Sequence, residues 1–135
     1  MILVDTNVVI DVLGGDPQWG AASAAALEWA ASRDELAIDE IVFAELAAGY
    51  DDIGKLEAAV AALRLSFALI PKMALFLAGH AFRRYRRSGG SKPNVLADFF
   101  IGAHAAVTGS MLLTRDPARI GRYFPTVAVI SPEAE

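Results

Sequence analysis

The chain alternates short, uninterrupted apolar runs with longer segments in which apolar residues recur at helical spacing. A short apolar run bounded by polar or turn residues is typical of a buried β-strand, and the longer periodic segments are typical of helices. Strands that alternate with helices predict an α/β fold with a mostly parallel sheet. The predicted strands cover residues 2–4, 36–38, 66–70, 111–113 and 127–130.

Capping residues and loop composition delimit the predicted helices. Asp39 stands where an N-cap is expected, Asn94 can cap a later helix, and Gly109 is positioned to end that helix. The stretches GGDP and SGGSKPN have the composition of loops. The predicted helices cover residues 8–13, 20–32, 40–50, 51–63, 73–87, 95–107 and 117–123.

Composition limits the class of protein. The 55% hydrophobic content and mean hydropathy of +0.40 raise the question of a membrane span. The longest uncharged run of the C-terminal half, residues 99–114, has 16 residues and several polar ones, whereas a span needs about 20 apolar residues. The chain has no cysteine and no basic leader at its start. We therefore expect one cytoplasmic domain over residues 1–135, with no membrane segment.

Charge is divided unevenly along the chain. Residues 1–57 hold twelve acids and two bases, whereas residues 58–132 hold ten lysines and arginines and two acids, Asp98 and Asp116. Two isolated carboxylates in a basic half of the chain are candidates for a functional role.

Four acids have settings that predict a shared site. Asp5 and Asp116 each follow a short apolar strand, and in open parallel sheets ligands bind outside the carboxyl ends of the strands. Glu45 and Asp98 lie within apolar helical segments, where we expect their carboxylates to be surrounded by bulky side chains and to need a partner. Carboxylate oxygens suit Mg²⁺ or Mn²⁺ better than Zn²⁺.

Each acid also has an ordinary structural alternative. Asp5 and Asp116 could cap helices, and Asp116-Pro117 is a common helix start. Glu45 could be the polar edge of its helix, and Asp98 could pair with an arginine such as Arg115. The joint pattern of four acids favours a metal site. His104 lies six residues beyond Asp98, about 600° around the helix, so we exclude it as a ligand.

Four segments resemble the signature segments of PIN-domain ribonucleases, and their order and spacing most resemble the VapC-type toxins of VapBC toxin–antitoxin pairs. The segments are MILVDTNVVIDVL, FAELAAGY, LADFFIGAHA and LLTRD. The resemblance covers nearly the whole chain and implies a PIN-like α/β/α sandwich with a central sheet of about four to five strands. It also implies an Mg²⁺- or Mn²⁺-dependent endoribonuclease that hydrolyses RNA phosphodiester bonds.

The resemblance assigns roles to individual residues. Asp5, Glu45, Asp98 and Asp116 would form the catalytic, metal-binding pocket. Asn7, Thr114 and, to a lesser degree, Thr6 would orient these ligands through hydrogen bonds. The chain departs from the family pattern at Val42, where a serine or threonine is common three residues before the glutamate.

A cationic rim is expected to bind the RNA, since basic side chains pair with phosphates. A solvated helix face is the alternative explanation of the basic cluster. The candidate RNA-binding residues are Arg83, Arg84, Arg86, Arg87, Lys92 and Arg115.

The high hydrophobic content predicts that part of the apolar surface is covered by another protein chain. The resemblance implies a homodimer and a cognate antitoxin, with the helices over residues 20–60 as the candidate antitoxin surface.

A haloacid dehalogenase-type phosphatase would need an aspartate where Asn7 stands, and a receiver domain would need a lysine after the late strand. A catalytically inactive PIN-like module that only binds RNA or a partner stays open.

Overall fold

The computed structural model describes residues 1–92 and 95–133. Its centre is a five-stranded parallel sheet in the order β3-β2-β1-β4-β5. Leu3 is in register with Ala37 on one side and with Leu112 on the other. The strands are β1 (Ile2–Val4), β2 (Leu36–Ile38), β3 (Leu65–Phe67), β4 (Met111–Leu113) and β5 (Val129–Ile130).

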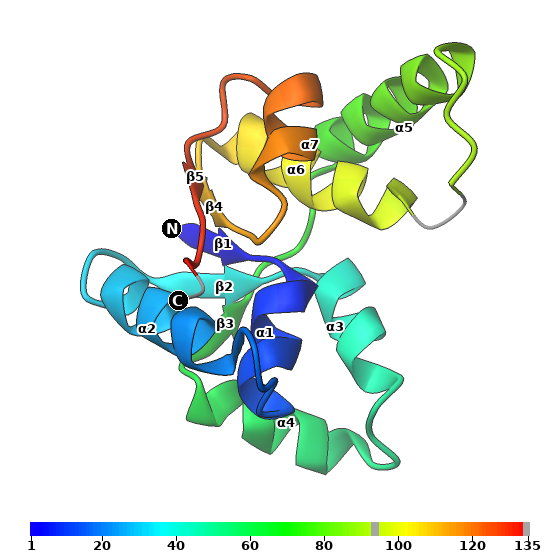
Figure 1. The fold of residues 1–135 in the computed structure, drawn as a ribbon. Helices are drawn as coiled ribbons and strands as arrows, with labels where there is room; N and C mark the ends of the chain where they lie inside the picture. Colours follow the sequence, from blue (N-terminus) through cyan, green and yellow to red (C-terminus); the bar gives the residue numbers. More distant parts are fainter. Residues whose placement is uncertain (93–94, 134–135) are drawn as a thin grey trace.

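Helices cover both faces of the sheet, with α1 to α4 below it and α5 to α7 above it in Figure 1. The predicted α/β fold with a parallel sheet is therefore confirmed. The helices are α1 (Thr6–Leu13), α2 (Gly20–Ala31), α3 (Glu40–Ala47), α4 (Ile53–Ala62), α5 (Lys72–Arg87), α6 (Leu96–Thr108) and α7 (Pro117–Tyr123).

The chain order of the strands creates a switch point between β1 and β4. From β1 the chain moves outward through β2 to β3, and then it crosses back to β4 and continues to β5. In doubly wound sheets the crevice at such a point, at the carboxyl ends of the strands, is the usual ligand site. Asp5 and Asp116 follow the two strands that flank it.

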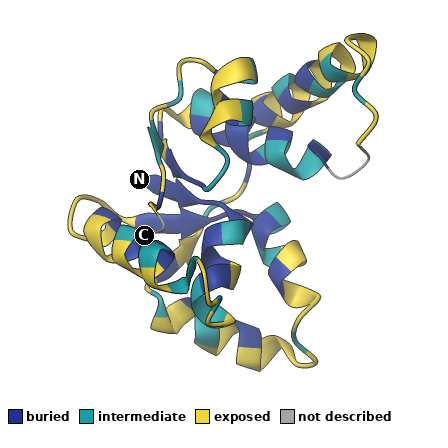
Figure 2. Cartoon of the chain, in the orientation of Figure 1, coloured by how far each residue is buried: buried dark blue, intermediate teal, exposed yellow. Residues whose placement is uncertain are grey.

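The strands β1 and β2 are buried, the edge strands β3 and β5 are partly exposed, and the outer faces of the helices are exposed (Figure 2). Leu3, Val4 and Leu112 have no exposed surface. On the upper face Phe99 of α6 packs edge-to-face against Tyr123 of α7, with ring centroids 4.9 Å apart, and against Tyr85 of α5 at 5.7 Å. These aromatic contacts hold the end of α6 that carries Asp98.

Several predicted boundaries differ from those in the structure. The first helix begins at Thr6 because Asp5 caps it, and β3 ends at Phe67 because the amide of Ile70 is bonded to the Glu40 side chain. Helix α3 ends at Ala47, and Asp52 caps α4. The predicted cap Asn94 lies outside the described residues, whereas Gly109 ends α6 in a left-handed conformation as predicted.

Among the described residues, no helix is both long enough and apolar enough to cross a membrane.

Candidate active site

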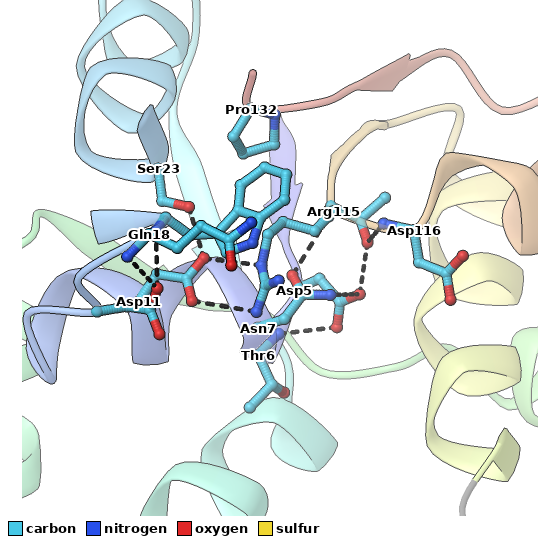
Figure 3. A network of polar contacts seen from close by, with 12 residues as sticks. Asp5, Thr6, Asn7, Asp11, Gln18, Ser23, Arg115, Asp116 and Pro132 are labelled. Carbon is cyan, nitrogen blue, oxygen red and sulfur yellow. Dashed lines mark hydrogen bonds and ion pairs between the residues drawn. The ribbon is translucent and has the colours of Figure 1, made fainter. Parts of the chain in front are cut away.

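Asp5 lies at the centre of the candidate site, where β1 passes into α1. Its side chain is 6% exposed, and one carboxylate oxygen accepts the amide of Thr6 at 2.8 Å, which caps the helix. The other oxygen accepts the hydroxyl of Thr114 at 2.7 Å. It also accepts the side-chain amide of Asn7 at 3.5 Å (Figure 3). The capping alternative for Asp5 is therefore correct, but it uses only one of the two oxygens.

The pKa of Asp5 is raised to about 6. Burial is the largest cause, and the nearby carboxylates of Asp98 and Glu45 add to it, while the Thr114 hydroxyl and the Thr6 amide oppose it. The raised pKa therefore reports mainly the burial of Asp5, with a smaller contribution from the negative charge of its neighbours, which a cation would offset.

The loop after β4 is tied to the start of α1. The amide of Arg115 donates to the side-chain oxygen of Asn7 at 3.3 Å, and the amide of Asp116 donates to Thr114 Oγ1 at 3.1 Å. Thr114 is fully buried and bonds to both Asp5 and the Asp116 backbone. The hydroxyl and amide side chains predicted to orient the acids therefore contact the segments that carry them.

Asp98 and Asp116 share one cationic partner, Arg119 of α7. Arg119 Nη1 forms an ion pair with Asp98 and lies 3.3 Å from an Asp116 carboxylate oxygen. Asp116 stands at the N-cap position of α7 and Pro117 is its first residue, so the predicted helix start is confirmed, but the Asp116 side chain makes no capping bond. The pKa of Asp98 is raised by burial, with Arg119 opposing the rise.

The environment of Glu45 differs from the predicted one. We expected its carboxylate among bulky core side chains, but the residue is exposed, because only Val42 and Leu46 of α3 are buried. Its carboxylate accepts the hydroxyl of Thr6 at 2.6 Å. The Thr6 side chain thus connects Glu45 to the segment that carries Asp5.

The predicted RNA-binding residues fall into two groups. Arg115 is held by Asp11, with Nε 2.8 Å and Nη2 3.1 Å from the Asp11 carboxylate oxygens, so its guanidinium is already engaged in an ion pair. The others are exposed, on the last turns of α5 and the loop beyond it: Arg83, Arg84, Arg86, Arg87 and Lys92.

A cluster around Asp11 was missed by the sequence analysis. This buried aspartate also accepts the hydroxyl of Ser23 at 2.7 Å (Figure 3). The guanidinium of Arg115 lies 4.9 Å from the ring centroid of Trp19. The available signal was an acid inside the apolar run VVIDVL. The cluster joins α1, α2 and the loop that carries Asp116.

A second buried pair links α3 to α6. His104 Nδ1 lies 3.0 Å from one oxygen of Asp39, and both side chains are almost fully buried. The other Asp39 oxygen accepts the amides of Ile41 and Val42, so the predicted N-cap is confirmed. His104 therefore serves the contact between the helices that carry Glu45 and Asp98.

The donor chemistry at the site fits a hard divalent cation. The four predicted acids supply carboxylate oxygens, and the charges of Asp98 and Glu45 add to the rise in the pKa of Asp5 that burial causes. Within residues 1–92 and 95–133, however, no three such side chains are arranged to hold one ion. Binding of a metal would require movement of at least one carboxylate, and Asp98 is turned toward Arg119.

Solved structures of similar fold come from toxin–antitoxin systems. The chain is similar to one in VapBC2 from Rickettsia felis bound to a promoter DNA fragment, with a TM-score of 0.73, 21% identity and coverage of 98% of this chain and 100% of that chain. It is also similar to a chain in a toxin–antitoxin complex from Klebsiella pneumoniae, with a TM-score of 0.70, 24% identity and coverage of 98% of each chain. A chain in VapBC-1 from nontypeable Haemophilus influenzae is similar with a TM-score of 0.70 and 20% identity, and the match covers 97% of this chain and 98% of that chain.

A comparison with curated proteins gave no match. The PIN domain family, by contrast, matches residues 2–123. That range covers the strands β1 to β4, every helix of the described chain and all four acids of the candidate site. The chain therefore belongs to the PIN domain family.

Proposed function

We propose that the protein is a metal-dependent endoribonuclease and the toxin of a type II toxin–antitoxin pair, acting in the cytoplasm. The observation that carries this proposal is the gathering of acids at the switch point of the sheet. Asp5 and Asp116 follow the two strands that flank it, and Asp98 and Glu45 lie close enough to Asp5 to affect its titration. Such a crevice is suited to a divalent cation and, through it, to a phosphodiester.

The cation would be held by four carboxylates, those of Asp5, Glu45, Asp98 and Asp116. A bound Mg²⁺ or Mn²⁺ lowers the pKa of water and neutralises charge on a phosphate. Thr114 and Asn7 keep the Asp5 carboxylate in one orientation, and Thr6 does the same for Glu45. An ionised carboxylate in this group can accept the proton of the attacking water.

RNA would be bound along the basic end of α5. The last turns of α5 lie at the same end of the molecule as the start of α6 (Figure 1). Phosphate contacts by basic residues give binding that weakens with salt. Arg115 is not needed for this surface because its guanidinium already pairs with Asp11. The exposed residues of the surface are Arg83, Arg84, Arg86, Arg87 and Lys92.

An antitoxin is the proposed protein partner. The structures with similar folds are toxin–antitoxin complexes, and an apolar groove of about 420 Å³ lies between α3, α4 and β3. Within it Ile53 is 65% exposed and Phe67 is 55% exposed. This groove borders the predicted antitoxin surface at residues 20–60. The exposed Met73 and Phe76 on α5 support the proposed homodimer.

A module that binds RNA or a partner without cleaving is the second candidate. The contact of Arg119 with two of the acids favours it, because a permanent ion pair would block the metal.

A cleavage panel separates the two candidates. Purified protein is incubated with labelled tRNA, rRNA fragments and single-stranded DNA in Mg²⁺, Mn²⁺ or EDTA, beside Asp5→Asn and Asp98→Asn. The proposed function predicts metal-dependent cleavage of RNA by the wild type that both variants lose. RNA binding without cleavage in either metal would favour the second candidate.

A further inference from the structure

We infer that Arg119 is an internal cation of the acidic site: its guanidinium holds Asp98 and Asp116 together in the metal-free protein and must leave them when a divalent cation binds. This inference rests on the proposed function, since it concerns the same four acids. It assigns to Arg119 a positioning role that competes with the metal.

The geometry places Arg119 between two of the proposed ligands. Nη1 is bonded to the carboxylate of Asp98 on α6 and lies 3.3 Å from that of Asp116, one turn earlier at the start of α7. One nitrogen therefore bridges two acids that come from different helices. A carboxylate oxygen in contact with this nitrogen has fewer lone pairs directed at a metal.

The charge balance of the site supports the same role. The Arg119 guanidinium places one positive charge in contact with two carboxylates, those of Asp98 and Asp116. Within residues 1–92 and 95–133, no other arginine or lysine forms an ion pair with any of the four acids. The nearby Arg115 is paired with Asp11 instead.

Arg119 is also free enough to move. Its side chain is 28% exposed, so the guanidinium can reach water without disruption of the core. The neighbouring Ile120 is buried and anchors α7, so a change at Arg119 need not displace the helix.

Calorimetric titration of Mn²⁺ at pH 7.5 tests the competition in the wild type, Arg119→Gln, Arg122→Gln and Asp98→Asn. Arg122→Gln is the matched control, because it removes the same charge from the same helix, and its guanidinium lies against the Tyr123 ring and touches no acid of the site. We expect Arg119→Gln to bind Mn²⁺ about three- to tenfold more tightly than the wild type, as the loss of a partly exposed competing ion pair would give. Arg122→Gln should stay within about twofold of the wild type.

A second readout follows the guanidinium directly. In protein with ¹⁵N-labelled arginine, the Nε–H signal missing from the Arg119→Gln spectrum belongs to Arg119. Saturating Mg²⁺ should shift or broaden that signal and leave the Arg115 signal in place, since Arg115 is held by Asp11. An Arg119 signal that does not change would overturn the inference.

The outcomes separate this inference from the proposed function. If the wild type binds Mn²⁺, Asp98→Asn does not, and Arg119→Gln binds no more tightly than Arg122→Gln, the inference is wrong and the metal site stands. If neither the wild type nor Arg119→Gln binds Mn²⁺ or Mg²⁺, both are wrong.

Discussion

The hydroxyl of Thr114 donates to the carboxylate of Asp5 at 2.7 Å, although 109 residues separate the two in the chain. This bond stabilises the ionised form of a buried acid, and it opposes the rise in the pKa of Asp5 that burial causes. Thr114 also accepts the amide of Asp116. One buried hydroxyl thus connects the ends of the two strands at the switch point.

Removal of this hydroxyl should change the pH dependence of activity. Thr114→Val loses the bond that lowers the pKa of Asp5, so the rise in cleavage rate with increasing pH should move upward by about one pH unit. Cleavage rates from pH 5 to 9 measure the shift. Thr114→Ser keeps the hydroxyl and should retain the wild-type profile, and identical profiles for the two variants would contradict this role of the hydroxyl.

Asp5 should destabilise the metal-free fold at neutral pH. Its pKa is about 6 in the folded chain and has the ordinary value of 3.8 in the unfolded chain, so the folded chain binds the proton more tightly. Stability due to this group is therefore fully present below about pH 4 and is lost as the pH rises through about 6. Asp5→Asn should be more stable than the wild type at pH 8 without metal, by at most about 3 kcal/mol.

Urea unfolding in EDTA at pH 8 and at pH 4 measures this difference. The advantage of Asp5→Asn should shrink at pH 4, where the folded wild-type protein carries the protonated side chain. An advantage that is larger at pH 4 would have the wrong sign and would refute the explanation by burial of charge.

Much of the fold could be predicted because strand runs and helix caps are local signals. The strand β1, the cap Asp39 and the helix end at Gly109 were all predicted from their neighbours in the chain. The partners of charged groups could not be predicted, since they depend on side chains far apart in sequence. Asp98 pairs with Arg119, and Arg115 pairs with Asp11, 104 residues away.

The exposure of Glu45 shows a related limit. The apolar residues around it in the sequence indicated a buried position, but helix α3 buries only Val42 and Leu46 and leaves Glu45 exposed. Which face of a short helix is buried depends on the packing of its neighbours. In the same way, the bond between His104 and Asp39 was not foreseen, because it joins two helices that are distant in the chain.

Loss of Arg115 alone should lower the free energy of unfolding more than loss of both charges of the Asp11–Arg115 pair. Asp11 is 2% exposed, so Arg115→Met leaves a buried charge with Ser23 as its remaining partner and should cost about 2 kcal/mol. The double variant Asp11→Asn/Arg115→Met removes that charge. It should be more stable than Arg115→Met alone in urea unfolding, and a double variant that is less stable would contradict this explanation.

The His104–Asp39 pair should matter for stability more than for RNA binding. His104→Leu leaves one buried oxygen of Asp39 without its partner, which should lower the free energy of unfolding by about 2 kcal/mol. Affinity for RNA, measured by fluorescence anisotropy, should stay within about twofold, because the basic surface on α5 is unchanged. A variant with wild-type stability would show that the pair contributes little.

The most direct test of the central claim compares two neutralised acids in one RNA cleavage assay. Asp98→Asn removes an acid of the site, and Glu28→Gln removes an exposed acid on α2 as the control. We predict that the wild type and Glu28→Gln cleave RNA in Mg²⁺ and stop in EDTA, while Asp98→Asn is at least about a hundredfold slower. Cleavage by Asp98→Asn at the rate of Glu28→Gln, or cleavage that persists in EDTA, would contradict a metal-dependent nuclease built on these carboxylates.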